Sequence, residues 1–225
     1  EIVGLIGPNG AGKTTFFNII TGVYEPTSGE VIFLDEAING LKPHEIATKG
    51  ISRTFQNIRL FSSMTVFENI LIGQYIRTEA NLYNVIFKNK KTIKEQERAT
   101  ERTQNIINFL ELEKHQNEIA TSLPYGVQRK IEIGRALATE PKLLLLDEPA
   151  AGMNTQEKIE MQDLIRKIRD KGYTVLLIEH DMKLVMGISD RVSVLDYGHK
   201  IAEGKPQEIQ NNEKVISAYL GKEVG

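Results

Sequence analysis

The chain has 225 residues, of which 40% are apolar and 26% are charged, and its formal net charge is −2. This size and composition are ordinary for one globular domain, and the slightly acidic balance argues against nucleic acid as the main partner. Cysteine is absent, which excludes both a disulfide framework and a thiolate metal site.

The first predicted element is a strand at the very start of the chain. Glu1 directly precedes the apolar run Ile2–Ile6, so we expect that an upstream segment is missing from this sequence. No apolar run reaches the length of a membrane span and no signal peptide is visible. We therefore expect a cytoplasmic location.

A glycine-rich loop follows this strand. Residues 7–14, Gly-Pro-Asn-Gly-Ala-Gly-Lys-Thr, have the spacing of a P-loop and precede a helix-compatible segment, residues 15–21. In a P-loop the backbone N–H groups surround the phosphates of a nucleotide, and the helix N-terminus faces the anion. We expect Lys13 to reach the β- and γ-phosphates and the Thr14 hydroxyl to bind Mg²⁺. The alternative is a loop that merely connects a strand to a helix.

Strand and helix patterns then alternate along the chain. Residues 30–34 and 50–55 are predicted to be short strands, and residues 65–114 are predicted to be helical. Residues 143–146 and 174–178 are continuous apolar runs, as in parallel strands buried on both faces. Between them one helical face carries Met161, Leu164, Ile165 and Ile168, with Gly172 at the helix end. This order predicts a doubly wound α/β sheet.

Polar residues end both of these apolar runs. Asp147 and Glu148 follow the first run, and His180 follows the second. Ligands of such sheets bind beyond the carboxyl ends of the strands. We expect Asp147 to hold Mg²⁺ through a water, Glu148 to act as general base, and His180 to contact the γ-phosphate. The alternatives are helix-capping carboxylates and a loop histidine.

Together the P-loop, Gln56 at a strand end, residues 122–129, residues 143–149 and His180 resemble the ordered motifs of an ABC-transporter ATPase. The resemblance covers essentially the whole chain. It implies an α/β fold: a P-loop NTPase (RecA-like) core with a mostly parallel sheet, a small antiparallel β part and an inserted helical subdomain. It also implies one domain, 1–225, with a nucleotide-binding core at 1–56 and 136–225. The helical subdomain, with the Q-loop and the signature region, would be 57–135.

The same resemblance assigns roles to residues. Gln56 would be the Q-loop glutamine, residues 123–128 the signature loop, residues 150–154 the D-loop, and His180 the switch histidine. The implied catalytic residues are Lys13, Gln56, Glu148 and His180, and the implied Mg²⁺ ligands are Thr14, Gln56 and Asp147. The implied ATP contacts are Gly7, Pro8, Asn9, Gly10, Ala11, Gly12, Lys13, Thr14, Thr15, Leu123, Pro124, Tyr125, Gly126, Val127 and Gln128.

Four segments, residues 53–61, 136–142, 178–186 and 215–221, resemble the LivG-type ATPase of branched-chain amino-acid importers. This branch implies ATP and Mg²⁺ as cofactors, and attachment to permease subunits at the cytoplasmic face of the membrane. A second ATPase subunit, identical or homologous, would close over the nucleotide, and a substrate-binding protein would act indirectly. Phe61, Met64 and Phe67 are candidate permease contacts or, alternatively, core residues of the helical subdomain.

Three features depart from the general family pattern. Residues 124–127 are Pro-Tyr-Gly-Val where most members have Ser-Gly-Gly-Gln. The missing serine hydroxyl predicts a weaker contact with the opposite subunit's nucleotide, one that relies on the Gly126 N–H and the helix dipole. Asn154 replaces the usual D-loop aspartate. The aromatic residue that stacks on adenine in this family would lie upstream of Glu1, so we expect a lower nucleotide affinity in a protein that begins at Glu1.

Other functions are less consistent with the motifs. A GTPase would need the guanine motif Asn-Lys-x-Asp, but Asn89-Lys90 is followed by Lys91-Thr92. A DNA-repair or translation ATPase of the ABC type would need a coiled-coil insertion, tandem domains or a basic face, and none is apparent. A non-catalytic ABC subunit, a urea or amide importer, and a lipopolysaccharide-export ATPase remain open as alternatives.

Overall fold

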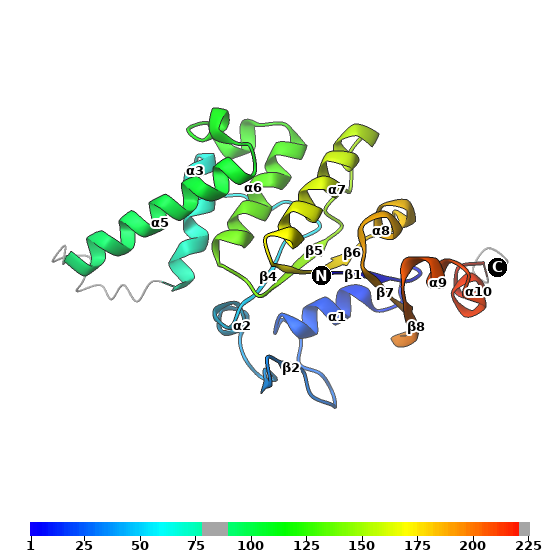
Figure 1. Ribbon diagram of the computed structural model, residues 1–225. Helices are drawn as coiled ribbons and strands as arrows, with labels where there is room; N and C mark the ends of the chain where they lie inside the picture. Colours follow the sequence, from blue (N-terminus) through cyan, green and yellow to red (C-terminus); the bar gives the residue numbers. More distant parts are fainter. Residues whose placement is uncertain (78–89, 221–225) are drawn as a thin grey trace.

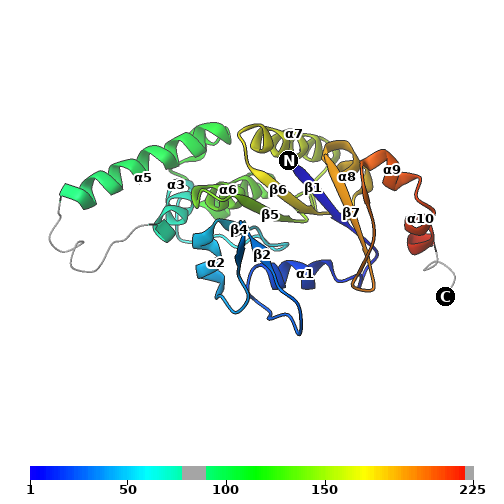
Figure 2. The same cartoon turned by 60° about the horizontal axis from the view of Figure 1, so that its bottom comes forward.

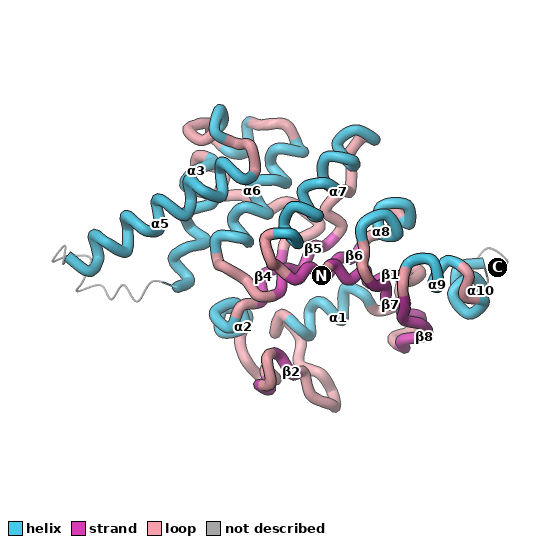
Figure 3. Tube along the Cα trace, viewed as in Figure 1, coloured by secondary structure: helices cyan, strands magenta, loops and turns pink. Residues whose placement is uncertain are grey.

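The computed structural model describes residues 1–77 and 90–220. A six-stranded sheet lies at its centre, in the order β4-β5-β6-β1-β7-β8, and Figure 3 shows these strands gathered between the helices. All neighbouring pairs are parallel except β7 and β8. The strands are β1 Ile2–Ile6, β4 Ile51–Arg53, β5 Leu143–Asp147, β6 Thr174–Ile178, β7 Arg191–Asp196 and β8 His199–Gly204. The predicted mostly parallel α/β sheet is confirmed.

The small antiparallel part is a hairpin of β2 (Ile32–Phe33) and β3 (Glu36–Ala37). The sequence predicted a longer strand over residues 30–34, and this was wrong in length. Leu34 and Asp35 have positive φ angles of 49° and 63°, as a two-residue hairpin turn requires. The strand therefore ends at Phe33.

Both faces of the central sheet are buried, so successive residues of a strand enter different cores. In β5, Leu144 and Leu146 belong to the larger core while Leu145 belongs to a smaller one. Helices α7 (Thr155–Asp170) and α8 (Met182–Ile188) cover the larger-core face, and α1 (Lys13–Ile20) and α2 (Pro43–Lys49) cover the other (Figure 2). This two-sided burial explains the continuous apolar runs.

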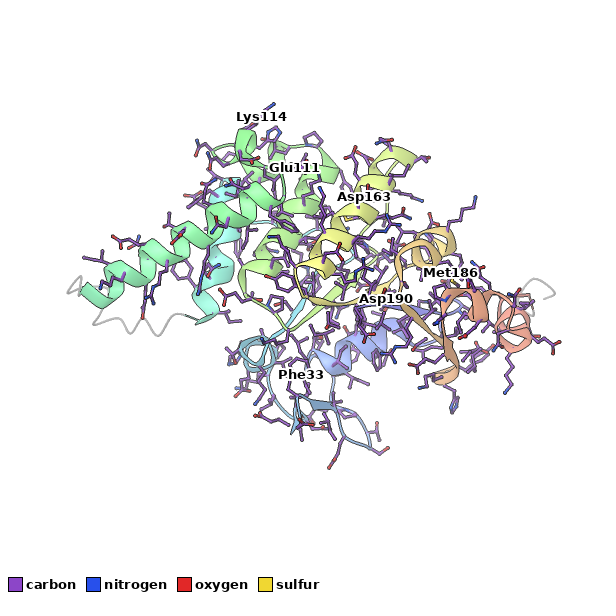
Figure 4. The ribbon with its side chains drawn as sticks, viewed as in Figure 1. Phe33, Glu111, Lys114, Asp163, Met186 and Asp190 are labelled. Atoms are coloured by element: carbon purple, nitrogen blue, oxygen red, sulfur yellow. The ribbon has the colours of Figure 1, made fainter. Side chains whose placement is uncertain are left out.

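The start of β1 is held by a residue from a distant part of the chain. Asp190, labelled in Figure 4, accepts a hydrogen bond from the Ile2 N–H at 2.7 Å and pairs with Arg169 of α7 at 3.2 Å. Since the loop after β1 is the predicted P-loop, this contact helps to fix the strand that positions the loop.

Helices α3 (Val66–Leu71), α5 (Lys90–Phe109) and α6 (Tyr125–Ala138) form a group beside the sheet (Figure 1). Short 3-10 helices span Ile72–Arg77, Glu113–His115 and Ala120–Ser122. The helical prediction for residues 65–114 is confirmed for most of the described residues, but residues 110–112 form a turn in which Glu111 has a φ of 60°. Residues 78–89 lie outside the described residues. The subdomain limits 57 and 135 stay a prediction. Two more helices, α9 (Pro206–Gln210) and α10 (Glu213–Leu220), follow β8.

Local sequence explains where α7 begins and ends. The Asn154 side chain accepts the Glu157 N–H at 3.0 Å, and the Glu157 carboxylate accepts the Asn154 N–H at 2.9 Å, which is a capping box. Gly172, with φ 95°, follows the last turn as predicted. The four predicted apolar positions of this helix are all buried. No helix of the described ranges, 1–77 and 90–220, is long and apolar enough to cross a membrane.

Candidate functional site

The P-loop connects β1 to α1 in a conformation that only glycine permits at its first position. A Cβ on Gly7, whose φ is 154°, would lie 2.1 Å from the Leu195 carbonyl oxygen of β7. Gly12, with φ 102°, is the N-cap of α1. The helix begins at Lys13, two residues before the helix-compatible segment 15–21.

The Lys13 side chain folds back over this loop. Its ammonium donates to the carbonyl oxygens of Gly7 at 2.7 Å and Pro8 at 3.1 Å, so its positive charge lies directly above the loop backbone. Thr14 and Thr15 are exposed in the first helical turn, where backbone N–H groups have no partner within the helix. A cation and a helix N-terminus thus face the same space, as an anion site requires.

Three predicted catalytic residues meet beyond the ends of β4, β5 and β6. The Gln56 amide nitrogen donates to Glu148 Oε2 at 3.0 Å, and His180 Nδ1 lies 3.6 Å from the same oxygen. Their order in the sheet explains this meeting, since β4 pairs with β5 and β5 pairs with β6. Glu148 has φ 47°, an unusual backbone conformation for this residue type, while its N–H donates to the Ile178 carbonyl at 2.9 Å.

Asp147, the predicted Mg²⁺ ligand, is nearly buried and pairs with Arg53. The Asp147 Oδ2 and Arg53 Nη2 atoms are 2.6 Å apart, and Arg53 also donates to Asn18 Oδ1 at 2.7 Å. Asn18 lies on α1, so Arg53 connects the carboxylate to the helix that follows the P-loop. Sequence reasoning gave Arg53 no role, although a cation ending a short buried strand was a usable signal.

Glu179 is a second residue that sequence reasoning left without a role. It is 2% exposed and accepts hydrogen bonds from the Ala150 N–H at 2.9 Å and the His180 N–H at 3.2 Å. Burial raises the pKa of the Glu179 carboxyl above its ordinary 4.5, although these hydrogen bonds oppose the shift. Glu179 therefore links the segment after β5 to the segment carrying His180.

The predicted signature loop, residues 123–128, begins α6. Leu123 is buried, whereas Tyr125 is 44% exposed. The Gln128 amide donates back to the Leu123 carbonyl at 2.7 Å, which stabilises the turn into the helix. Gly126 and Tyr125 lie against Glu157 of α7 and against Gly152 of the segment after β5. The loop therefore borders both the start of α7 and the predicted D-loop.

The chain is similar in sequence to proteins of a known family. A family model described as "ABC transporter" matches residues 1–151. A second, described as "Branched-chain amino acid ATP-binding cassette transporter", matches residues 199–225.

Curated relatives match almost the whole chain. "High-affinity branched-chain amino acid transport ATP-binding protein LivG" of Escherichia coli strain K12 is 48% identical over 99% of this chain and 88% of its own length. The protein BraF of Pseudomonas aeruginosa, with the same description, is 46% identical over the same shares.

Solved structures agree with these relatives. A nucleotide-free ATP-binding cassette from an ABC transporter is 36% identical with a TM-score of 0.82, over 97% of this chain and 87% of its own. A dimeric ATP-binding cassette in a post-hydrolysis state, bound to ADP and Pi, is 26% identical with a TM-score of 0.74, over 92% and 85%. Because these matches span nearly the whole chain, it belongs to the ABC-transporter ATP-binding proteins and is a nucleotide-binding ATP hydrolase.

Proposed function

We propose that this ATPase powers the uptake of branched-chain amino acids through a membrane permease. The names of the LivG and BraF relatives and the match of residues 199–225 support this class of solute. The proposed ATP hydrolysis is supported mainly by one observation: Gln56 and His180 both lie close to the Glu148 carboxylate.

In the proposed reaction Glu148 accepts a proton from the water that attacks the γ-phosphorus, while the bond to the bridging oxygen breaks and ADP leaves. Gln56 positions the Glu148 carboxylate, and His180 contacts the γ-phosphate. Lys13 exchanges its two carbonyl acceptors for phosphate oxygens, and residues 7–15 supply N–H groups around the phosphates. Catalysis is then mainly positioning and charge stabilisation.

Thr14, Asp147 and Gln56 would hold Mg²⁺. A hydroxyl, a carboxylate and an amide oxygen are the hard donors that this ion prefers. Because Asp147 pairs with Arg53, it would hold the ion through a water. The Gln56 amide nitrogen is directed to Glu148, which leaves its oxygen for the ion. Bound Mg²⁺ would offset the negative charge of the β- and γ-phosphates.

A second copy or a homologous subunit would complete the nucleotide site with residues 123–128. The N-terminus of α6 begins at Tyr125, so its helix dipole and the Gly126 N–H can face a phosphate despite the absent serine. The dimeric relative bound to ADP and Pi supports an assembly of two cassettes.

A groove of about 530 Å³ lies between α2 and the helical group, and we assign it to the permease. Its lining includes Phe55, Arg59, Phe61, Ile72, Ile76 and Arg135. Phe61 is 45% exposed, and the Arg135 guanidinium lies 5.4 Å from its ring centre. An amphipathic permease helix with apolar and acidic side chains fits such a lining. Bound to the permease through this groove, the chain would lie at the periphery of the membrane. A substrate-binding protein would contact the permease and not this chain.

Of the three candidate contacts, Phe61 lines this groove, whereas Phe67 packs against the larger core. We therefore interpret Phe67 as a core residue of the helical subdomain and Phe61 as a permease contact.

The test is uptake in cells that lack their own branched-chain amino-acid importers. The chain, expressed with its permease subunits and binding protein, should restore uptake of radiolabelled leucine, and its Glu148→Gln variant should not. Uptake of urea instead of leucine would favour an amide importer. Hydrolysis without uptake of either solute would favour export, and no ATP hydrolysis by the purified assembly would favour a non-catalytic subunit.

A further inference from the structure

Helix α6 carries a buried pair of opposite charges. Arg129 and Glu132 are 0% and 2% exposed, and Arg129 Nη1 lies 2.8 Å from Glu132 Oε2. They stand one helical turn apart on the face that meets the chain after β4. Neither residue belongs to the cluster of Gln56, Glu148 and His180, although Glu132 also lines the groove between α2 and the helical group.

Both residues contact the backbone that carries Gln56. Arg129 donates to the Phe55 carbonyl at 2.6 Å and to the Gln56 carbonyl at 2.7 Å. Glu132 Oε1 accepts the Phe55 N–H at 3.4 Å and the Arg59 N–H at 3.3 Å. The carbonyl groups of this segment are thus held by the cation, and its N–H groups by the anion.

The same guanidinium reaches the signature loop. Arg129 Nη2 donates to the Tyr125 hydroxyl oxygen at 3.0 Å, and the Arg129 guanidinium carbon lies 5.7 Å from the Tyr125 ring centre. Tyr125 is half exposed beside Gly152. One side chain therefore connects the loop that would meet the second subunit with the residue whose amide contacts Glu148.

Stability alone does not explain a buried pair at this place. Taking two charges out of water is costly, and apolar residues of similar volume often serve a core equally well. Arg129 Nε is also buried without a partner among the described residues, which adds to the cost. The planar guanidinium can nevertheless donate to several acceptors at fixed angles, which a lysine or an apolar residue cannot do.

We propose that Arg129, oriented by Glu132, is a positioning residue that couples the signature loop to Gln56. A displacement of Tyr125 when the second subunit closes would shift the Gln56 backbone and hence its amide relative to Glu148. The inference rests on the proposed function, because it gives Arg129 a task only if Gln56 and Glu148 act in hydrolysis.

The experiment is a double-mutant cycle on ATP hydrolysis by the permease-bound ATPase. The four proteins are the wild type, Arg129→Lys, Gln56→Ala and the double variant. We expect Arg129→Lys to lower kcat about 10- to 100-fold, as for a misplaced catalytic group, with little change in KM for ATP. In the Gln56→Ala background the same substitution should have little further effect, because its target is already gone.

Tyr125→Phe provides a second variant that removes only the hydroxyl acceptor, and Tyr24→Phe is its matched control, since Tyr24 is 54% exposed on a turn beyond α1. We expect kcat to fall with Tyr125→Phe and not with Tyr24→Phe. Ile133→Val, a buried change on the same helix, controls for loss of stability and should leave kcat unchanged.

Two results would overturn the coupling role. Equal fold-losses from Arg129→Lys with and without Gln56 would show that Arg129 acts independently of that residue. A kcat for Tyr125→Phe equal to that of wild type would separate the signature loop from the pair. Failure of the proposed function is distinguishable, since Gln56→Ala itself would then leave hydrolysis unchanged.

Discussion

The Arg53 guanidinium lies 2.6 Å from the Asp147 carboxylate, and both side chains are less than one tenth exposed. The two residues end neighbouring strands, so a buried ion pair occupies the place where Mg²⁺ is proposed to bind. The positive charge of Arg53 compensates the charge of this carboxylate. Its guanidinium and the metal ion would share Asp147 in the nucleotide-bound protein.

We predict that Arg53→Gln lowers the free energy of unfolding by about 3 kcal/mol without nucleotide, because it leaves Asp147 buried without its cation. Mg²⁺-ADP should restore part of this loss, since the ion replaces the missing charge. Urea unfolding with and without Mg²⁺-ADP measures both effects.

Arg191→Gln is the matched control for that substitution. Arg191 pairs with Glu1 and Glu203 but is 47% exposed, so its loss should cost less than about 1 kcal/mol. If Mg²⁺-ADP stabilises the wild type and Arg53→Gln by the same amount, the ion and Arg53 do not share Asp147.

Glu148→Gln should reduce ATP hydrolysis by a factor of about 10² to 10⁴, as expected when a general base is lost. Nucleotide binding should persist, so the variant should form a dimer with Mg²⁺-ATP and remain monomeric with ADP. Phosphate release and light scattering during size exclusion measure the two properties.

Glu111→Gln serves as the control. Glu111, labelled in Figure 4, pairs with Lys167 on the surface, so its substitution should leave hydrolysis unchanged. A Glu148→Gln variant that stays monomeric while it binds ATP would show that the subunits close only with the permease or a homologous partner.

The raised pKa of Glu179 predicts a pH dependence of stability. The folded protein binds the proton of the Glu179 carboxyl more tightly than the unfolded chain does. The resulting contribution to the stability of the fold is fully present below the ordinary pKa of 4.5, and it is lost as the pH rises through the raised pKa. The Glu179→Gln variant carries no such proton. The stability of the variant relative to wild type, measured as the difference in free energy of unfolding, should therefore increase as the pH rises from 4.5.

Urea unfolding at a series of pH values measures this difference, and other titrating groups cancel because they are common to both proteins. A difference that does not vary with pH would mean that Glu179 titrates normally in the folded protein.

Phe61→Ala should diminish the stimulation of ATP hydrolysis by the permease, because it removes an exposed aromatic ring from the proposed docking groove. The measurement is the ratio of hydrolysis rates with and without reconstituted permease. Ile159→Ala, a similarly exposed apolar residue on α7, is the control and should keep the ratio. An unchanged ratio for Phe61→Ala would place the permease elsewhere.

Much of this molecule followed from local sequence. The P-loop was predictable because its glycines, lysine and helix start act within a few residues, and the Lys13 ammonium indeed contacts carbonyls only five and six residues away. The strands β5 and β6 were predictable because burial on two faces requires continuous apolar residues. The helix α7 was predictable because its cap and its apolar face have local spacing.

Tertiary structure decided which of these parts meet. Gln56 and Glu148 are 92 residues apart in the chain, Arg53 and Asp147 are 94 apart, and Arg129 and Phe55 are 74 apart. A sequence motif identifies residues whose side chains could bind phosphate or take part in hydrolysis. Only strand order and helix packing bring such distant side chains within hydrogen-bond distance. The family resemblance, the phosphate loop and the candidate carboxylates could therefore be predicted from the amino-acid sequence. The pairs Arg53–Asp147 and Arg129–Glu132, and their contacts around Gln56, became visible only when the chain was folded.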